Sequence, residues 1–243
     1  MKIDLVDFTG ACNPDSLYAA RVLVFTKNTR LSMNAAQWDM VKSMPTNKLM
    51  EELSYMANTI PSSWEFVHYT FAVQGVTRAC THQMVRTRTA SFAQQSMRVT
   101  DMSGFRYLTP QGMNGNAEAI YCDAMEQINT SYKNMRSIGV AEEDARGVLP
   151  TNILTNIVAG YNLRAMADLV KSREGGRTQG EYREAVRLMG DAILQVHPWA
   201  ALFLYPKGRN YFQELESKIE NIAISSDGRR ELLKIIDKMR KDQ

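Results

Sequence analysis

The sequence predicts an α+β fold: a helix-rich single domain with a modest antiparallel or mixed sheet. Two short segments, 1–8 and 64–73, have the alternation or the β-branched and aromatic residues that are typical of strands. From residue 116 onward, apolar side chains recur at helical spacing. The 243 residues contain no internal repeat and no linker rich in glycine, serine or proline, and they suffice for one large core.

The N-terminal elements follow from local patterns. Residues 1–8 alternate apolar and polar side chains, and Thr9-Gly10 ends this predicted strand. The Asn-Pro-Asp-Ser segment at 13–16 is typical of a turn that opens a helix, and helical apolar spacing follows it. A second helix is expected from about 46 to 57. The stretch 64–73 is the clearest strand because β-branched and aromatic residues dominate it.

The rest of the chain is predicted to be mainly helical. Five segments have helical periodicity, near 116–138, 141–147, 151–171, 178–196 and 228–241. Glycine or proline residues interrupt them, at Gly139, Pro150, Gly175-Gly176 and Pro198. The last segment has an apolar stripe and a basic face, as expected of a solvated final helix.

The composition excludes several classes of protein. The chain has 29 Lys and Arg against 26 Asp and Glu, and a net charge of +3 is too small to indicate a nucleic-acid partner. It has no run of 18 apolar residues and no signal sequence, so we expect a cytoplasmic protein without a membrane span. Three cysteines without CxxC spacing and three scattered histidines predict neither a disulfide framework nor a metal site. Neither a GxGxxG fingerprint nor a Walker A sequence is present.

A basic segment before residue 99 concentrates the polar chemistry. On a helix, Arg78, His82 and Arg86 would share one face, which is positive if solvated and requires anions if buried. Beyond Arg86, a loop that extends to Arg98 is rich in serine and glutamine and nearly free of carboxylates. Such a set suits a phosphate or diphosphate together with a planar amide heterocycle. A solvated basic helix face has the same composition, so composition leaves both interpretations open.

The order of residues in this segment resembles the signature of the flavin-dependent thymidylate synthases, the ThyX family. That signature reads Arg-His-Arg, seven residues, Ser, and the chain has Arg-Thr-Arg at 86–88 followed after seven residues by Ser96. Downstream, Ala-Arg-Gly-Val-Leu-Pro at 145–150 is similar to the family's Ala-Arg-x-Val-Leu-Pro. Upstream, the segment 61–66 is similar to a diverged form of the family's entry into a strand. The resemblance spans roughly residues 1–200.

The resemblance implies a ThyX-like catalytic domain over 1–205, with a helical C-terminal extension over 206–243 outside it. It implies reductive methylation of dUMP to dTMP, with FAD as the cofactor and NADPH and methylenetetrahydrofolate as co-substrates. Members of the family bind FAD and dUMP at the subunit interfaces of a homotetramer. We therefore expect a homotetramer that acts on a nucleotide, with no membrane or nucleic-acid partner.

The resemblance also assigns roles to individual residues. FAD is expected to contact Arg86, Thr87, Arg88, Asn162, Arg164 and Asp168. The nucleotide is expected to contact Gln83, Gln94, Ser96, Arg98, Arg146 and Arg173. Arg98 and Arg146 suit the phosphate because guanidinium groups make bidentate, charge-assisted contacts. Arg173 and Ser96 are expected to be catalytic, with Arg173 stabilising negative charge that develops on the pyrimidine ring.

Three departures from the family pattern leave alternatives open. Thr87 stands where the signature has His, Ala93-Gln94 stands where the family usually has Asn-Glu, and Asn58 lies near the position of an upstream His. An amide at position 94 offers both a donor and an acceptor, whereas a carboxylate only accepts. One alternative is a flavin-dependent hydroxymethylase of dUMP or dCMP. The other, from a different class, is a non-catalytic protein that binds nucleotide or nucleic acid.

Overall fold

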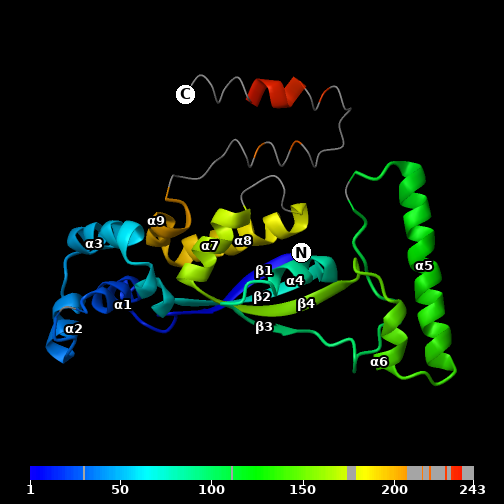
Figure 1. The fold of residues 1–243 in the computed structure, drawn as a ribbon, viewed down its shortest axis with the longest axis horizontal. Helices are drawn as coiled ribbons and strands as arrows, with labels where there is room; N and C mark the ends of the chain where they lie inside the picture. The colour runs from blue at the N-terminus through cyan, green and yellow to red at the C-terminus, as the bar shows by residue number, and fades with distance from the viewer. Residues whose placement is uncertain are drawn as a thin grey trace. The chain divides into compact units, whose positions relative to one another are not determined.

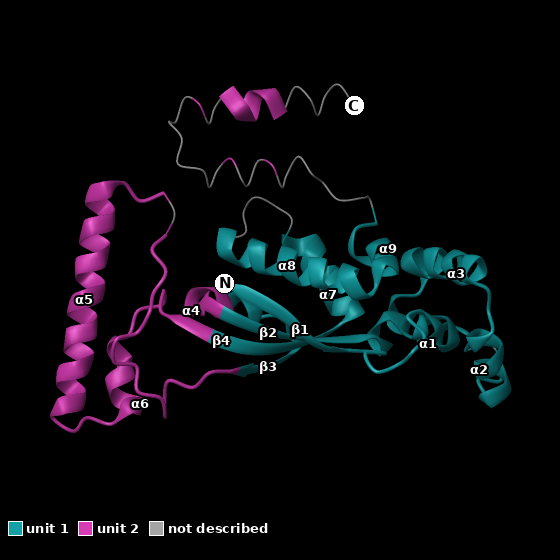
Figure 2. Ribbon diagram, turned by 180° about the vertical axis from the view of Figure 1, so that it is seen from behind, with its two compact units in different colours: residues 1–74, 83–93, 156–209 teal, residues 75–82, 94–155, 210–243 magenta. Residues whose placement is uncertain are grey.

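The computed structural model confirms the α+β prediction. It describes residues 1–29, 31–110, 112–173 and 179–206, together with 215, 219, 228 and 231–236. Helices accompany a four-stranded antiparallel sheet with the strand order β1-β2-β4-β3 (Figure 1). The chain forms two compact units, coloured separately in Figure 2: unit 1 comprises 1–74, 83–93 and 156–209, and unit 2 comprises 75–82, 94–155 and 210–243.

β2 and β4 are the two central strands of the sheet. Its strands are β1 (Lys2–Phe8), β2 (His68–Thr77), β4 (Leu154–Asn162) and β3 (Ser91–Gln94). β1 pairs antiparallel with β2, with Lys2 opposite Gln74 and Phe8 opposite Tyr69. Buried and less buried residues alternate along most of β2 and along β4. Since successive side chains of a strand point to opposite faces, each of these strands has one face in the core.

Helices cover the sheet in unit 1 and extend beyond it. They are α1 (Tyr18–Lys27), α2 (Ala35–Lys42), α3 (Thr46–Thr59), η1 (Pro61–Phe66), α7 (Leu163–Arg173), α8 (Gly180–Val196), η3 (Pro198–Ala200) and α9 (Ala201–Leu204). α7 and α8 pack together along one face of the sheet, where α8 contacts β1 (Figure 1). Tyr69, Tyr161 and Tyr182 are among the largest fully buried side chains. Buried aromatic side chains such as these contribute much of the apolar contact that holds the helices on the sheet.

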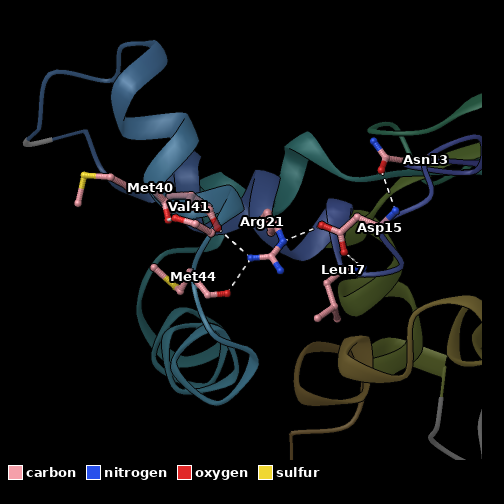
Figure 3. Close-up of polar contacts among 8 residues, drawn as sticks. Asn13, Asp15, Leu17, Arg21, Met40, Val41 and Met44 are labelled. Atoms are coloured by element: carbon pink, nitrogen blue, oxygen red, sulfur yellow. Dashed lines mark hydrogen bonds and ion pairs between the residues drawn. The ribbon is translucent and has the colours of Figure 1, made fainter.

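A buried arginine joins α1 to the segment after α2. Arg21 is 9% exposed, and its Nε donates to Asp15 Oδ2 at 2.7 Å (Figure 3). Its Nη1 donates to the carbonyl oxygens of Val41 at 2.8 Å and Met44 at 3.0 Å. These carbonyls lie at the end of α2 and before α3, so one guanidinium holds three parts of the N-terminal helical region together.

Unit 2 contains α5 and several short elements. Its helices are most of α4 (Arg78–Met84), α5 (Gly115–Ser137), α6 (Glu142–Ala145) and η2 (Arg146–Val148). Asn114 caps α5, because its Oδ1 accepts from the Ala117 N–H at 3.0 Å. Only Met125 and Tyr132 of α5 are buried among the described residues. The other described residues of this long helix are exposed or only half-buried.

Most predicted elements are confirmed. The strand at 1–8 is β1, and the helices expected near 46–57, 116–138 and 178–196 are α3, α5 and α8. The strand expected at 64–73 begins only at His68, because a 3-10 helix precedes it. α2 and β3 were not predicted. Most of the predicted extension over 206–243 lies outside the described residues, and so does the Gly175-Gly176 pair. Of the final helix expected at 228–241, residues 231–236 are described and are helical.

Two helix predictions are wrong. The segment 151–171 is not one helix, because it forms β4 and then α7. The residues buried in β4 alternate, and β-branched Thr155 and Ile157 favour the strand. The helix that was to place Arg78, His82 and Arg86 on one face ends at Met84. Arg86 instead lies in a turn, and its backbone N–H donates to the Gln83 carbonyl oxygen at 3.2 Å. Within the part of the chain that is described, no helix is long and apolar enough to cross a membrane.

Candidate functional site

The residues predicted for the site are divided between the two compact units. Unit 1 holds Gln83, Arg86, Thr87, Arg88, Asn162, Arg164, Asp168 and Arg173. Unit 2 holds Gln94, Ser96, Arg98 and Arg146. All the residues predicted for the flavin therefore belong to unit 1, whereas most of those predicted for the nucleotide belong to unit 2.

The turn after α4 presents two exposed arginines. Fully buried Met84 anchors the end of α4, and its carbonyl oxygen accepts from the Thr87 N–H at 3.1 Å. The side chains of Arg86 and Arg88 are exposed, and neither forms an ion pair with any described residue. Two nearby guanidinium groups without a carboxylate provide charge and donors that suit a diphosphate.

The start of α7 carries three further residues of this group. Asn162 Oδ1 accepts from the Ala165 N–H at 2.8 Å, so its side chain caps the helix. Arg164 Nη1 lies 2.7 Å from Glu65 Oε1, and both side chains are about half exposed. Asp168 is exposed one turn after Arg164, and residues four apart share a helix face. This face therefore presents both charges to the surface of unit 1.

The N-terminal end of α8 holds the two remaining residues of unit 1. The Arg173 guanidinium carbon lies 5.0 Å from the centroid of the Tyr182 ring. Arg173 Nε is buried and has no hydrogen-bond partner. Gln83 Nε2 donates to Oε1 of Gln179, which immediately precedes α8. The structure thus brings Gln83 and Arg173, both predicted to contact the nucleotide, to the same end of one helix.

In unit 2, Glu143 joins two segments that carry predicted residues. Arg98 Nε lies 2.6 Å from Glu143 Oε2, and Arg146 Nε donates to the Glu143 carbonyl oxygen at 3.1 Å. Ser96 Oγ accepts from the Arg98 N–H at 3.1 Å, which fixes the turn between them. Glu143 therefore contacts Arg98 through its carboxylate and Arg146 through its backbone carbonyl, and Ser96 is joined to Arg98.

Gln94 is held in a defined orientation by a hydroxyl group. Its Nε2 lies 2.9 Å from Thr81 Oγ1, and Thr81 Oγ1 donates to the Arg78 carbonyl oxygen at 3.0 Å. Because the single hydroxyl proton of Thr81 goes to that carbonyl, Gln94 must donate through its amide N–H. Arg78 Nη2 also donates to the Gln95 carbonyl oxygen at 3.1 Å. Two side-chain hydrogen bonds thus tie the start of α4 to the loop that carries Ser96.

The histidines and cysteines lie apart from these groups. His68 and His82 are exposed, and Cys80 is fully buried in α4. His197 is buried in unit 1, where its Nδ1 lies 3.0 Å from the Tyr69 hydroxyl. Burial lowers the pKa of His197 from 6.5 to about 4. Over the described ranges, no three His, Cys, Asp or Glu side chains are grouped as metal ligands.

Sequence reasoning missed the partners of the predicted residues. Arg78 and Thr81 lie in the basic segment. Their side chains can form hydrogen bonds, and this property could have marked them in the sequence as partners of the site residues. Glu143 follows a helix start, and its pairing with Arg98 depends on a contact between residues 45 positions apart. Tyr182 had no local signal, because its contact with Arg173 arises from the packing of α7 on α8.

Comparisons with known proteins identify relatives of the chain. The family model described as thymidylate synthase complementing protein matches residues 4–199. The flavin-dependent thymidylate synthase of Nitratidesulfovibrio vulgaris is 34% identical over 176 residues, which cover 68% of this chain and 67% of the relative. That of Sulfolobus acidocaldarius is 30% identical over 84% of this chain and 76% of the relative. That of Clostridium tetani is 29% identical over 82% and 84% respectively.

Proposed function

The chain belongs to the family of thymidylate synthase complementing proteins, and from this premise we propose that it is a flavin-dependent thymidylate synthase. It transfers a one-carbon unit from methylenetetrahydrofolate to dUMP and forms dTMP, with FAD as cofactor and NADPH as reductant. The observation that supports this most strongly is the family match over 4–199, which includes every residue predicted for the site. No observation favours the hydroxymethylase or the non-catalytic alternative.

The polar groups of unit 1 fit FAD. Arg86 and Arg88 are exposed without ion pairs among the described residues, and a diphosphate supplies the negative charge that they lack. Asn162 and Arg164 add amide and guanidinium donors at the start of α7. We therefore assign FAD to the six residues Arg86, Thr87, Arg88, Asn162, Arg164 and Asp168. When bound, the flavin supplies the hydride that completes the methyl group.

The remaining polar residues are assigned to the nucleotide. Arg98 and Arg146, with Ser96, bind the phosphate, because guanidinium groups give charge-assisted contacts to its oxygens. Gln83 and Gln94 orient the nucleotide by hydrogen bonds from their amides. Arg173 lies near the pyrimidine carbonyls and stabilises the negative charge that develops as C5 becomes nucleophilic. The Tyr182 ring supports this role, since it holds the Arg173 guanidinium without consuming its N–H donors.

We assign a homotetramer with sites at subunit interfaces. Support comes from α5, where Ile120 is 72% exposed, and from Ile138 at its end, which is 80% exposed. A long helix with so few buried residues has apolar surface available for a second subunit. Light scattering during size-exclusion chromatography measures the mass; a monomer at micromolar concentration would contradict this assignment.

A direct assay tests the function. The purified chain is incubated with dUMP, methylenetetrahydrofolate and NADPH, and mass spectrometry identifies the nucleotide formed. We expect dTMP, and no product when FAD has been removed and not restored. Reactions that lack one co-substrate serve as controls. A yellow, FAD-containing protein that forms no dTMP, or forms a hydroxymethyl nucleotide, would contradict the proposed function.

A further inference from the structure

The N-terminal end of α8 carries two residues that the sequence did not assign to the site, Gln179 and Tyr182. Gln179 immediately precedes the helix, and Tyr182 lies about one helical turn further on. Gln179 Oε1 accepts a hydrogen bond from Gln83 Nε2. The Tyr182 ring centroid lies 5.0 Å from the guanidinium carbon of Arg173. This helix end therefore contacts the two residues of unit 1 that are assigned to the nucleotide.

Tyr182 offers a fixed surface to Arg173. Its side chain is fully buried, and α7, which ends at Arg173, packs on α8. A buried ring in a packed core keeps one orientation, whereas an arginine side chain is long and loses rotamer entropy when it is held in place. The attraction between the guanidinium and the ring face offsets part of that loss before a ligand binds. The contact therefore orders Arg173 in advance.

Among the described residues, this ring is the contact that orients the Arg173 guanidinium. Arg173 forms no ion pair with any of them, and its Nε is buried without a hydrogen-bond partner. Stacking occupies the face of a guanidinium, and its N–H donors lie in the plane of the group. The ring thus fixes the orientation of Arg173, and no described carboxylate neutralises its charge.

Gln179 orients the other residue through an amide. It accepts from Gln83 Nε2, so a half-buried side chain near the end of α4 has a partner at the start of α8. A primary amide has two N–H donors and one carbonyl acceptor. Gln83 therefore keeps one N–H and its carbonyl oxygen for a ligand. These two groups complement the edge of a pyrimidine, which also carries a donor and acceptors.

We propose that the N-terminal end of α8 is a positioning element of the nucleotide site, in which Tyr182 is a positioning residue for Arg173. Gln179 is a positioning residue for Gln83. This inference rests on the proposed function, because Arg173 and Gln83 are assigned to dUMP. Tyr182 and Gln179 act through their partners and not on the substrate. Replacing either of them should therefore reduce activity only while its partner is present.

A double-mutant cycle on kcat/KM for dUMP tests the contact of Tyr182 with Arg173. Full-length, FAD-loaded protein is assayed for dTMP formation. Tyr182→Leu is expected to lower kcat/KM about tenfold, which is the size of one desolvated cation–π contact. In an Arg173→Ala background, the same substitution should change kcat/KM by less than about twofold, because the side chain that it positions is gone. Tyr182→Phe keeps the ring and should stay within about threefold of the wild type.

The same cycle tests the amide pair. Gln179→Leu should lower kcat/KM for dUMP about fivefold, as expected for the loss of one neutral hydrogen bond. In a Gln83→Ala background, Gln179→Leu should have no further effect, because the amide that it orients is absent. Equal losses with and without Gln83 overturn the role of Gln179.

A control variant separates positioning from loss of packing in α8. Ile193 is fully buried in the same helix, three turns beyond Tyr182. Ile193→Ala removes buried volume from the core and should keep the wild-type kcat/KM. Circular dichroism and flavin content show whether each variant is folded. If Tyr182→Leu is not folded, Tyr182→Met takes its place in the cycle, since a flexible methionine fills irregular space without a ring.

The outcomes distinguish this inference from the proposed function. A folded, flavin-loaded Tyr182→Leu protein with wild-type kcat/KM overturns the positioning role, while dTMP formation by the wild type still stands. A tenfold loss that persists in the Arg173→Ala background also overturns it, because Tyr182 would then act through the packing of the core. A wild-type protein that forms no dTMP overturns both proposals.

Discussion

Replacing His197 together with its partner Tyr69 is expected to remove a loss of folding stability at acidic pH. His197 follows α8, and its side chain is 2% exposed. Its ring centroid lies 5.0 Å from that of Trp199 and 5.2 Å from that of Phe8. Burial raises the pKa of the Tyr69 hydroxyl, so the hydroxyl stays protonated and donates to His197 Nδ1. The neutral imidazole suits this site, because an imidazolium would lose the acceptor and would bring a charge into an aromatic cluster.

The magnitude follows from the pKa of His197. Burial lowers that pKa from 6.5 to about 4, so the unfolded chain binds more protons than the folded protein between these values. The contribution of His197 to stability is therefore fully present above about pH 6.5 and is lost as the pH falls toward 4. The limit is roughly 3 kcal/mol, at about 1.4 kcal/mol for each pH unit. Between about pH 8 and about pH 5, we expect a loss of roughly 2 kcal/mol.

The assay is urea unfolding of the wild type and of the His197→Phe/Tyr69→Phe double variant at both pH values and at one protein concentration. The double substitution removes the titrating ring without leaving a buried hydroxyl unpaired. Tyr69→Phe alone serves as the control, since it retains the histidine. The free energy of unfolding of the wild type minus that of the double variant should fall by roughly 2 kcal/mol from about pH 8 to about pH 5. The same difference at both pH values would refute the reasoning.

Four further substitutions test the site and the fold. Arg86→Ala should lower the FAD content of the purified protein, measured as the ratio of flavin to protein absorbance; unchanged content would count against the FAD assignment. Arg173→Ala and Ser96→Ala should each reduce dTMP formation by about a hundredfold while circular dichroism stays as in the wild type, and near-normal turnover would remove the catalytic assignment. Arg21→Met should lower the free energy of unfolding by about 2–4 kcal/mol in urea, because the carbonyl oxygens that Arg21 holds lose their donor. A change below 1 kcal/mol, about the cost of one ordinary hydrogen bond, would contradict that role.

The missed strand β4 shows where periodicity fails. The buried residues Ile157, Tyr161, Ala165 and Leu169 recur at intervals of four across β4 and α7. A spacing of four fits both a strand, which repeats every two residues, and a helix, which repeats every 3.6 residues. The segment therefore has helical spacing throughout, although its first half is a strand. The strand β1 was predictable because its alternation is not continued into a helix.

The residues of the site were predictable from their order along the chain, whereas their partners were not. The family resemblance identified Asn162 and Arg164, but it does not state that Asn162 caps α7 or that Arg164 pairs with Glu65. Such pairs join residues far apart in the sequence, and the ion pair between Arg164 and Glu65 spans 99 positions. Only the packing of η1 against α7 brings these two side chains together.

The amide at position 94 has a local physical reason. The Thr81 hydroxyl gives its proton to the Arg78 carbonyl, so the atom that meets its oxygen from position 94 must be a donor. Glutamine satisfies this requirement, and glutamate, which stands there in the family pattern, does not. A glutamate would force Thr81 to turn its proton away from the carbonyl and leave that carbonyl without this bond. Gln94 and Thr81 therefore form a matched pair, and the departure at position 94 removes a charge while keeping the start of α4 tied to the loop that carries Ser96.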